Sequence, residues 1–354
     1  MSLRKICDDA VQLLINMIKT PSLSGDEEDV AILIRDFLEQ RSVTVQTVKN
    51  NTWCRNKYWD DNKPVILLNS HIDTVRPVDG WTYDPYGATV QDGKVIGLGS
   101  NDAGGPLVSL LAVFLWFYEK EDLPFNLIFA ATAEEESSGK NGVALMVSVF
   151  PHVDFAVVGE PTQMSLAVAE KGLVVVDCVA KGRAGHAARN EGINSIYLAL
   201  DDIDKIRKYS FGKVSDLLGN VKMTVTQIES GFQHNVIPDT CRFVIDIRTN
   251  ELYSNEDVVN ILKGLIRSEV TPRSLRLNSS GISHDHPFVQ KAVALGIECY
   301  GSPTLSDQSL MPYKSIKIGP GDSARSHTAD EYIYSWEIEK GIETYISLLS
   351  GLQL

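Results

Sequence analysis

Side chains that commonly bind metal ions follow the apolar segments of this 354-residue chain. In an open α/β sheet, the ligand site lies beyond the carboxyl ends of the strands. Apolar segments that begin near residues 65, 94, 126, 155 and 314 each lead to at least one such side chain. These side chains are His71, Asp73, Asp102, Glu134, Glu135, Glu136, Glu160 and His327. We therefore expect them to converge at one edge of a sheet.

Each of these residues has an ordinary structural interpretation when it is taken alone. A His-x-Asp pair such as His71 and Asp73 is often a surface pair, and Asp102 could cap a helix or form a turn. A run of glutamates is commonly a solvated acidic surface. The shared position at strand ends makes a common metal site the better interpretation of the whole set.

The charges of the candidate ligands favour two divalent metal ions over one. Asp102, Glu135 and Glu160 supply three negative charges. A hydroxide shared by the two ions would supply a fourth, so that the site would be neutral. Carboxylate and imidazole ligands suit Zn²⁺, with Co²⁺ as a substitute.

Neighbouring residues of ligand type can have different roles, one binding a metal ion and the other transferring a proton or supporting a ligand. Consecutive side chains in an extended or turning segment point in different directions, so one glutamate can bind a metal while the next stays free. The free carboxylate can take a proton from water and pass it to the leaving amine. The spacing of His71 and Asp73 allows Asp73 to accept a hydrogen bond from the imidazole and to fix its tautomer.

The elements that must position these residues follow from the alternation of apolar and helical segments. Solidly apolar runs such as VILLNS and NLIFAAT predict strands that are buried on both faces, with crossover helices between them. We expect an α/β domain with a mixed, mostly parallel sheet, formed by residues 1–170 and 282–354. Ser24 and Glu27 have the spacing of a capping box for a helix over residues 26–40.

Residues 171–281 show a different pattern, which predicts an inserted α+β domain. Partly alternating strands and two helices follow one another in the order β-α-β-β-α-β. We expect the second helix at residues 256–267 and the last strand at residues 274–278. This order is typical of a small ferredoxin-like sandwich.

Composition and charge disfavour several classes of partner. The net charge of −13 argues against nucleic acid and anionic membrane surfaces, because phosphate binding requires clustered Lys and Arg. The longest apolar run, residues 106–117, is too short to span a bilayer. Five scattered cysteines without a Cys-x-x-Cys pair are typical of reduced thiols, and no signal-type segment precedes the first expected helix. We therefore expect a cytoplasmic protein.

Seven segments together resemble the dizinc deacylase and metallopeptidase family of acetylornithine deacetylase, succinyl-diaminopimelate desuccinylase and carboxypeptidase G-type enzymes. These segments, which extend over essentially the whole chain, are SHIDTV, GLGSNDAGG, TAEEESSGKNG, VVGEPT, KGRAGHAARNEGINSI, HNVIPD and GPGDSARSHTADE. The resemblance implies a zinc-exopeptidase-like fold whose inserted domain serves as a lid and as the dimerisation domain of a homodimer.

The resemblance implies a complete set of metal ligands. His71 and Glu160 would bind one zinc ion, and Glu135 and His327 would bind the other. Asp102 would bridge the two ions, and the peptide bond that follows it would be cis.

The resemblance also implies roles for residues around the metal ions. Glu134 would be the general acid/base, and Asp73 would hold the metal-binding histidine that precedes it. His186 would reach the site of the partner subunit and stabilise the oxyanion of the tetrahedral intermediate. Asn235 corresponds to a position linked to the oxyanion, and Arg248 to one linked to a substrate carboxylate.

The choice of substrate depends on two segments near the end of the chain. The GPGDS segment before His327 most resembles acetylornithine deacetylases, which favours hydrolysis of N2-acetylornithine in arginine biosynthesis. Desuccinylases carry a Ser-Asp-Gly/Ala-Arg stretch where this chain reads LSDQSLM. A succinyl group would need a positively charged partner such as Arg325 or Arg189.

Three alternative functions stay open at this point. The chain could be a desuccinylase that acts on succinylornithine or succinyl-diaminopimelate, or a dipeptidase or aminopeptidase of the same family. Both keep the dizinc mechanism, and a panel of substrates separates them. A non-catalytic binding protein on the same scaffold is a more distant alternative, since its expected mark is a missing ligand or base.

Overall fold

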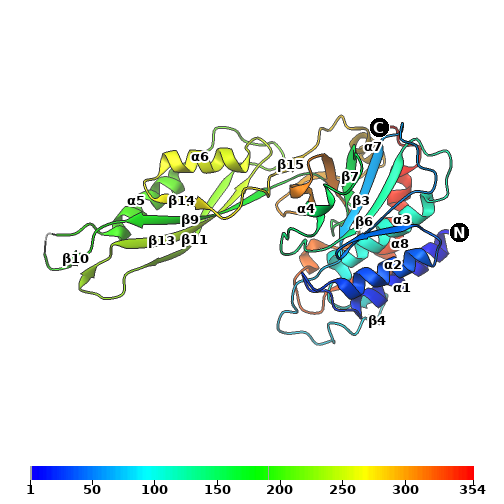
Figure 1. Ribbon diagram of the computed structural model, residues 1–354, viewed down its shortest axis with the longest axis horizontal. Helices are drawn as coiled ribbons and strands as arrows, with labels where there is room; N and C mark the ends of the chain where they lie inside the picture. Colours follow the sequence, from blue (N-terminus) through cyan, green and yellow to red (C-terminus); the bar gives the residue numbers. More distant parts are fainter. Residues whose placement is uncertain (1, 190) are drawn as a thin grey trace. The chain divides into compact units, whose positions relative to one another are not determined.

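The computed structural model describes residues 2–189 and 191–354, which form two compact units. The first unit consists of Met1–Val168, Ile282–Tyr300 and Ser306–Leu354. The second consists of Ala169–Gly281 together with Gly301–Leu305. The second unit is therefore an insertion in the chain of the first, as the colours along the sequence in Figure 1 make visible.

The first unit is built on a mixed sheet with a parallel centre. Its strand order is β1-β2-β6-β3-β7-β17-β8, and β16 also pairs with β8. The four central strands β6, β3, β7 and β17 run parallel to one another, whereas β1, β2 and β8 pair antiparallel with their neighbours on this path. The predicted mixed α/β sheet is confirmed. The strands are β1 (Val45–Val48), β2 (Asn51–Arg55), β3 (Val65–His71), β6 (Asn126–Thr132), β7 (Phe155–Val158), β8 (Leu166–Glu170), β16 (Cys299–Ser302) and β17 (Lys314–Lys317), whereas β15 (Ser280–Gly281) falls in the second unit.

Helices and a small accessory sheet surround this main sheet. The helices are α1 (Leu3–Ile18), α2 (Glu28–Glu39), α3 (Gly105–Phe117), α4 (Val143–Met146), α7 (Pro287–Ala294) and α8 (Ser335–Leu349). Three single-turn segments are η1 (Ser100–Gly104), η2 (Asp307–Leu310) and η3 (Ser323–Arg325). The accessory sheet has the order β18-β5-β4, with β4 (Thr89–Gln91), β5 (Lys94–Ile96) and β18 (Tyr332–Tyr334).

Both faces of the central strands are covered, as their solidly apolar sequences predict. Every residue of β3 and β6 is buried. Helix α3 packs on these two strands and contacts α1 and α8, which explains why it is apolar nearly all round. On the opposite face, Val143 and Met146 of α4 pack with Leu67 and Ile128 of the sheet. Among the described residues, no helix is long and apolar enough to cross a membrane.

The strand expected before Asp102 belongs to the accessory sheet and not to the main sheet. Strand β5 ends at Ile96, and the chain then turns through Gly97 and Gly99 into η1. A Cβ atom at Gly97 would lie 2.4 Å from Cγ2 of Ile18, and Gly99 has a φ of +74°. These glycines therefore permit a close turn, through which the chain leads from the accessory sheet to Asp102 beside the main sheet. The predicted cis peptide bond between Asp102 and Ala103 is confirmed.

The capping box predicted at Ser24 and Glu27 does not form. Helix α2 begins at Glu28 without a side-chain cap. The hydroxyl of Ser24 instead donates to Asp73, and the carboxylate of Glu27 accepts from the backbone N–H of Gly25 and from the Asn50 side chain. Both side chains are engaged by more distant parts of the first unit, which the local sequence pattern does not reveal.

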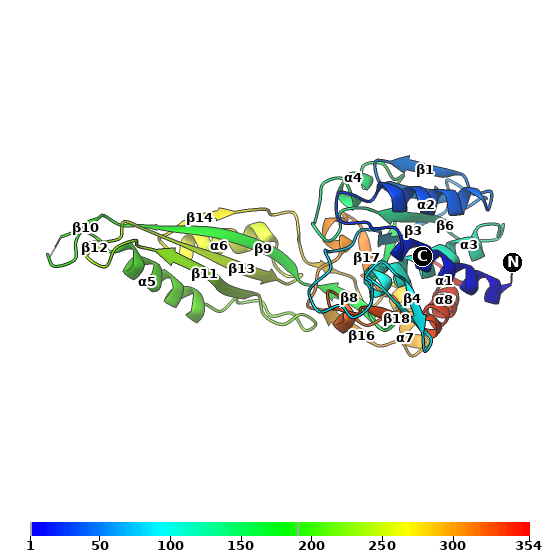
Figure 2. The ribbon, with the colours of Figure 1, turned by 90° about the horizontal axis from the view of Figure 1, so that it is seen from below.

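The second unit is an antiparallel sheet with two helices, in the order β11-β13-β9-β14 that is typical of a ferredoxin-like sandwich (Figure 2). Its last strand lies at residues 269–272 and not at 274–278, because α6 ends earlier than expected and the chain turns at once into β14. The elements are β9 (Gly172–Lys181), β10 (Gly185–His186), α5 (Ser195–Lys208), β11 (Lys222–Ser230), β12 (Val236–Ile237), β13 (Thr240–Thr249), α6 (Asn255–Leu265) and β14 (Glu269–Pro272).

Candidate metal centre

His71 is the last residue of β3, and it lies buried among carboxylates of the first unit. Its Nδ1 lies 2.9 Å from the carbonyl oxygen of Asp73, which can only accept a hydrogen bond. In a neutral ring, Nδ1 therefore carries the proton and Nε2 is free to bind a metal. Nε2 lies 3.3 Å from Oδ1 of Asp102 and 3.9 Å from Oε1 of Glu160.

A second imidazole approaches the other oxygen of Asp102. His327, in the loop that follows η3, has its Nε2 3.7 Å from Oδ2 of Asp102. The same Nε2 lies 3.0 and 3.1 Å from the two carboxylate oxygens of Glu136. Asp102 thus faces His71 with one oxygen and His327 with the other, which is the position that a bridging carboxylate requires.

Two overlapping sets of ligand atoms are close enough to hold metal ions. His71, Asp102 and Glu136 offer one set, and His71, Glu135 and Glu160 offer the other, each with its atoms within 4.8 Å of one another. The sets share His71 and combine imidazole with carboxylate, which is the donor chemistry that Zn²⁺ accepts. The donor set of the first unit therefore fits divalent metal ions.

The electrostatics of this cluster also favour bound cations. Burial, opposed by the charge of His71 and helped by that of Asp102, raises the pKa of Glu160 to about 8. Burial likewise raises the pKa of Glu135 well above its usual range. A hydrogen bond with Glu136 raises the pKa of His327 to about 9. Several buried like charges in one place are stabilised by a cation, as in many metal sites.

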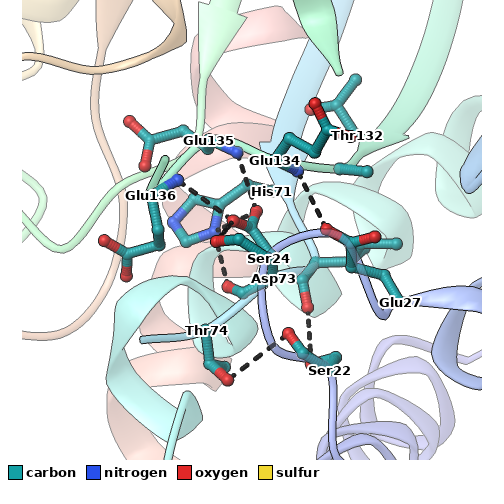
Figure 3. Close-up of polar contacts among 12 residues, drawn as sticks. Ser22, Ser24, Glu27, His71, Asp73, Thr74, Thr132, Glu134, Glu135 and Glu136 are labelled. Carbon is teal, nitrogen blue, oxygen red and sulfur yellow. Dashed lines mark hydrogen bonds and ion pairs between the residues drawn. The ribbon is translucent and has the colours of Figure 1, made fainter. Parts of the chain in front are cut away.

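Asp73 contacts further residues of the cluster in addition to its neighbour His71. Its Oδ1 accepts from the backbone N–H of Glu135 at 2.9 Å, and its Oδ2 accepts from that of Glu136 at 3.0 Å. The hydroxyl of Ser24 donates to Oδ2 at 2.6 Å. Figure 3 shows these contacts converging on Asp73. Asp73 therefore fixes the turn that carries two of the candidate carboxylates.

The structure differs from the expectation for Glu134. Its carboxylate accepts from the backbone N–H of Asn141 at 2.9 Å and from the Asn141 side chain at 2.6 Å. Glu134 has a φ of +58°, so the chain turns sharply at this residue. As a result Glu135 and Glu136 face the cluster, whereas Glu134 does not. The expected pairing of His327 with Glu135 is likewise replaced by a pairing with Glu136.

Three further candidates lie in the second unit. His186 on β10 is exposed, and Asn235 lies beside it, because the N–H of Ala187 donates to the Asn235 carbonyl at 3.0 Å. Arg248 on β13 forms two hydrogen bonds with Asp246, at 2.9 and 3.1 Å. Asn235 directly precedes β12, the strand that pairs with β10 of His186, while the guanidinium of Arg248 already has a carboxylate partner within its own strand.

Arg325 is engaged by its own surroundings in the first unit. Its Nη1 lies 2.7 Å from Oε2 of Glu337, and its guanidinium carbon lies 4.6 Å from the centre of the Tyr332 ring. These contacts are those of a structural ion pair stacked on an aromatic ring. They leave it poorly suited to the substrate-binding role expected from the sequence.

Several residues of this site were given no role on the basis of the sequence. Glu136 received no role, although it follows the same strand as its two neighbours. Asp307, the aspartate of LSDQSLM, is buried and accepts from Asn69 and Thr132, and burial raises its pKa to about 6. Glu331 is buried beneath the loop of Asp102. Glu331 follows the candidate ligand His327 by four residues, and this position in the sequence could have indicated that it belongs to the site.

A mixed α/β sheet that gathers two histidines and several buried carboxylates at one edge is the arrangement of a metal-dependent hydrolase. Residues 67–351 match the sequence profile of Peptidase family M20/M25/M40, so the chain belongs to this family.

Relatives by sequence include desuccinylases and peptidases. A succinyl-diaminopimelate desuccinylase of Orientia tsutsugamushi is 23% identical over 342 residues, which cover 92% of this chain and 85% of that protein. A peptidase M20 domain-containing protein of Schizosaccharomyces pombe is 27% identical over 96% of this chain and 83% of its own length. A probable carboxypeptidase of Aspergillus oryzae is 29% identical over 66% of this chain, and the match spans only 60% of that protein.

Solved structures share the whole fold. An aminopeptidase PepT of Bacillus cereus has a TM-score of 0.77 at 17% identity, and the match covers 97% of this chain and 98% of that one. A dinuclear metal-binding M20 peptidase of Bacillus subtilis has a TM-score of 0.74 at 17% identity, with 98% of both chains covered. These structures support the two-unit α/β architecture.

Proposed function

We propose that this chain is a two-metal amide hydrolase that removes the acyl group from a small N-acyl amino acid. The observation that carries the proposal is the position of Asp102, whose two oxygens face His71 and His327 in a buried cluster of carboxylates. One imidazole on either side of a single carboxylate is the arrangement expected for two metal ions that share that carboxylate as a ligand.

The contacts support one division of the ligands between the two ions. His71 and Glu160 would hold the first ion together with Asp102, since Nε2 of His71 lies near both carboxylates. Glu136 and His327 would hold the second ion together with the other oxygen of Asp102. When bound, the ions would polarise the amide carbonyl and lower the pKa of a water molecule.

Glu135 is the residue that we propose as the general acid/base. It belongs to the candidate set formed with His71 and Glu160, while its neighbour Glu136 is paired with His327. Its carboxylate would take a proton from the attacking water as the new C–O bond forms. It would then give that proton to the nitrogen of the departing amine as the C–N bond breaks.

The relatives favour a succinyl group over the acetyl group expected from the sequence. The succinyl-diaminopimelate desuccinylase of Orientia tsutsugamushi matches nearly the full chain, and a probable succinyl-diaminopimelate desuccinylase of Staphylococcus aureus Mu50 is 24% identical over 95% of it. We therefore propose N-succinyl amino acids, such as succinylornithine or succinyl-diaminopimelate, ahead of N2-acetylornithine. The likeness to carboxypeptidases makes a small peptide the second candidate.

A homodimer formed through the second unit is part of the same proposal. Strand β11 is an edge strand of its sheet, and it exposes Ile228, which is followed by the 83% exposed Phe232. Helix α5 exposes Tyr197 and Leu200. Exposed apolar side chains on one small unit are typical of a protein interface. In such a dimer, His186 and Asn235 would serve the site of the partner subunit.

Hydrolysis of a defined panel of substrates tests this proposal. The protein loaded with Zn²⁺ is assayed with N-succinylornithine, N-succinyl-diaminopimelate, N2-acetylornithine and a dipeptide, and release of the free amine is measured. We expect turnover of a succinyl substrate that is lost after chelation and in Asp102→Asn. Turnover of the dipeptide alone would replace the deacylase by a peptidase, and no turnover by a protein with two bound ions would contradict the proposal.

A further inference from the structure

Glu331 is a buried glutamate whose carboxylate accepts three backbone N–H groups from one loop. Only 2% of this residue is exposed to solvent. Its Oε1 accepts from Asn101 at 2.8 Å and from Asp102 at 2.9 Å, and its Oε2 accepts from Gly99 at 3.1 Å. The loop that it holds is the one that delivers Asp102 to the cluster.

The same loop is tied to the segment that carries His327. The Asn101 side chain donates to the carbonyl of Asp322 at 3.0 Å and accepts from the N–H of the same residue at 2.9 Å. Glu331 lies four residues after His327 in this segment. The segment of residues 322–331 therefore contacts the Asp102 loop at both of its ends.

We propose that Glu331 is a positioning residue that fixes Asp102 in register with His327. The proposal rests on the two-metal function proposed above. Glu331 contacts the backbone of Asp102 and not its carboxylate, so it acts through Asp102 and does not touch substrate. Glu331 holds Asp102 at its backbone, while the two carboxylate oxygens of Asp102 face His71 and His327.

Only a carboxylate satisfies this arrangement fully. All three partners are N–H donors, and a carboxylate offers acceptors on both oxygens and no donor. In Glu331→Gln, the amide NH₂ would face a backbone N–H, so either the Gly99 contact or the contacts with Asn101 and Asp102 would be lost. The loop would then be free to shift, and the bridging carboxylate would move with it.

Glu337 provides a matched control for the general cost of changing a buried glutamate. It is also buried, at 8% exposure, and it accepts from the backbone N–H of Tyr334 at 2.9 Å. Its other partner is the Arg325 guanidinium at 2.7 Å. Glu337 anchors Arg325 of the 322–331 segment but does not contact the backbone of the Asp102 loop, so its replacement tests stability and the hold on that segment without the contacts that Glu331 makes.

Titration of the metal-free protein with Co²⁺, followed by visible absorption, tests the inference without relying on turnover. In Glu331→Gln we expect binding of the bridged pair of ions to weaken by about 10- to 100-fold, as is typical when a residue that supports a ligand is replaced. We expect kcat with the best substrate to fall by a similar factor while KM changes by less than about threefold. Glu337→Gln should lower the unfolding temperature but bind both ions as the unmodified protein does.

Each other outcome has a defined meaning. Two ions bound by Glu331→Gln with unchanged affinity, spectrum and kcat would overturn the inference, as would equal weakening in Glu337→Gln. If Glu331→Gln does not fold, Glu331→Asp is used instead. It retains the charge, but its shorter side chain moves the carboxylate oxygens away from the loop, so we expect the same loss of Co²⁺ affinity. If the unmodified protein binds two ions yet hydrolyses no substrate, the proposed function fails while the titration still decides the role of Glu331. Fewer than two ions in the unmodified protein would overturn both.

Discussion

Three consecutive glutamates follow β6, and the backbone gives each of them different surroundings. The turn at Glu134 directs that carboxylate to Asn141. Asp73 then holds the N–H groups of Glu135 and Glu136, whose side chains belong to the two candidate ligand sets. The positive φ angle of Glu134 separates the surroundings of the three glutamates, and a run of identical residues does not predict such an angle.

Exchange of each glutamate for glutamine separates these roles. In Glu135→Gln we expect kcat to fall by about 10²- to 10⁴-fold, because the amide cannot accept the proton of the attacking water. Glu134→Gln should retain kcat within about threefold, since its carboxylate only contacts Asn141. The two values are measured at saturating substrate with matched metal content. A larger loss in Glu134→Gln would restore the role expected for it from the sequence.

Metal binding by the metal-free protein should depend on pH. The pKa of Glu160 is raised to about 8 by burial, and that of His327 to about 9 by its contact with Glu136. Both groups therefore carry protons at pH 7, and these protons must leave when a metal binds. We expect affinity to increase between pH 7 and 9. Calorimetry in two buffers with different ionisation enthalpies measures the released protons, and an enthalpy that is independent of the buffer would contradict this.

At the scale of elements, the apolar strands position most of the site and are the part that the sequence predicts best. Strands β3, β6 and β7 are buried on both faces, so their patterns mark where His71 and Glu160 must follow. Asp102 is different, because the short strand before it belongs to the accessory sheet and the glycine turn determines its direction. Contacts between distant segments, such as Ser24 with Asp73, leave no periodic pattern in the sequence.

The second unit depends on a buried contact between α5 and the connection from α6 to β14. The carboxylate of Asp202 accepts from the backbone N–H and the hydroxyl of Ser268, both at 2.8 Å, and from the N–H of Arg267. Burial opposes ionisation of Asp202, but these hydrogen bonds hold its pKa below the ordinary value. The contribution to stability is therefore present above the unfolded pKa and is lost as pH falls through the lowered folded pKa.

We expect Asp202→Asn to reduce the free energy of unfolding of the second unit by about 1–3 kcal/mol at pH 7, because its NH₂ group cannot accept from Ser268. The difference from the unmodified protein should begin to shrink below the unfolded pKa of about 4 and should be lost as pH falls through the lowered folded pKa, where the folded aspartate takes up its proton. Urea denaturation at pH 7 and at pH 3 measures both values. An equal difference at the two pH values would show that the charge of Asp202 is unimportant.

At the scale of the whole molecule, the second unit carries residues that the metal centre alone does not supply. His186 on β10 is exposed, and Asn235 directly precedes the paired strand β12; their roles follow only from the resemblance to known enzymes. The fold and the metal-binding residue types could be predicted from the sequence. The acyl group of the substrate could not be predicted from the sequence. Arg325 and Arg248 suggested a partner for a substrate carboxylate, but they are bound to Glu337 and Asp246.

Mixing two inactive variants tests whether His186 acts across a dimer. In a mixed dimer of His186→Ala and Glu135→Gln, one site would combine an intact glutamate with the intact histidine of its partner. Random exchange of subunits should then restore about a quarter of the activity of the unmodified protein. Activity is measured before and after mixing, with each variant alone as the control. No recovery in a mixture that sedimentation shows to be dimeric would contradict action across the dimer.

The most direct test of the central claim is anomalous diffraction at the zinc edge from crystals of the Zn²⁺-loaded protein. We expect two peaks about 3.5–4 Å apart, one beside His71 and Glu160 and the other beside Glu136 and His327, with Asp102 between them. One peak alone, or a peak bound by Glu134, would contradict the two-metal centre described here.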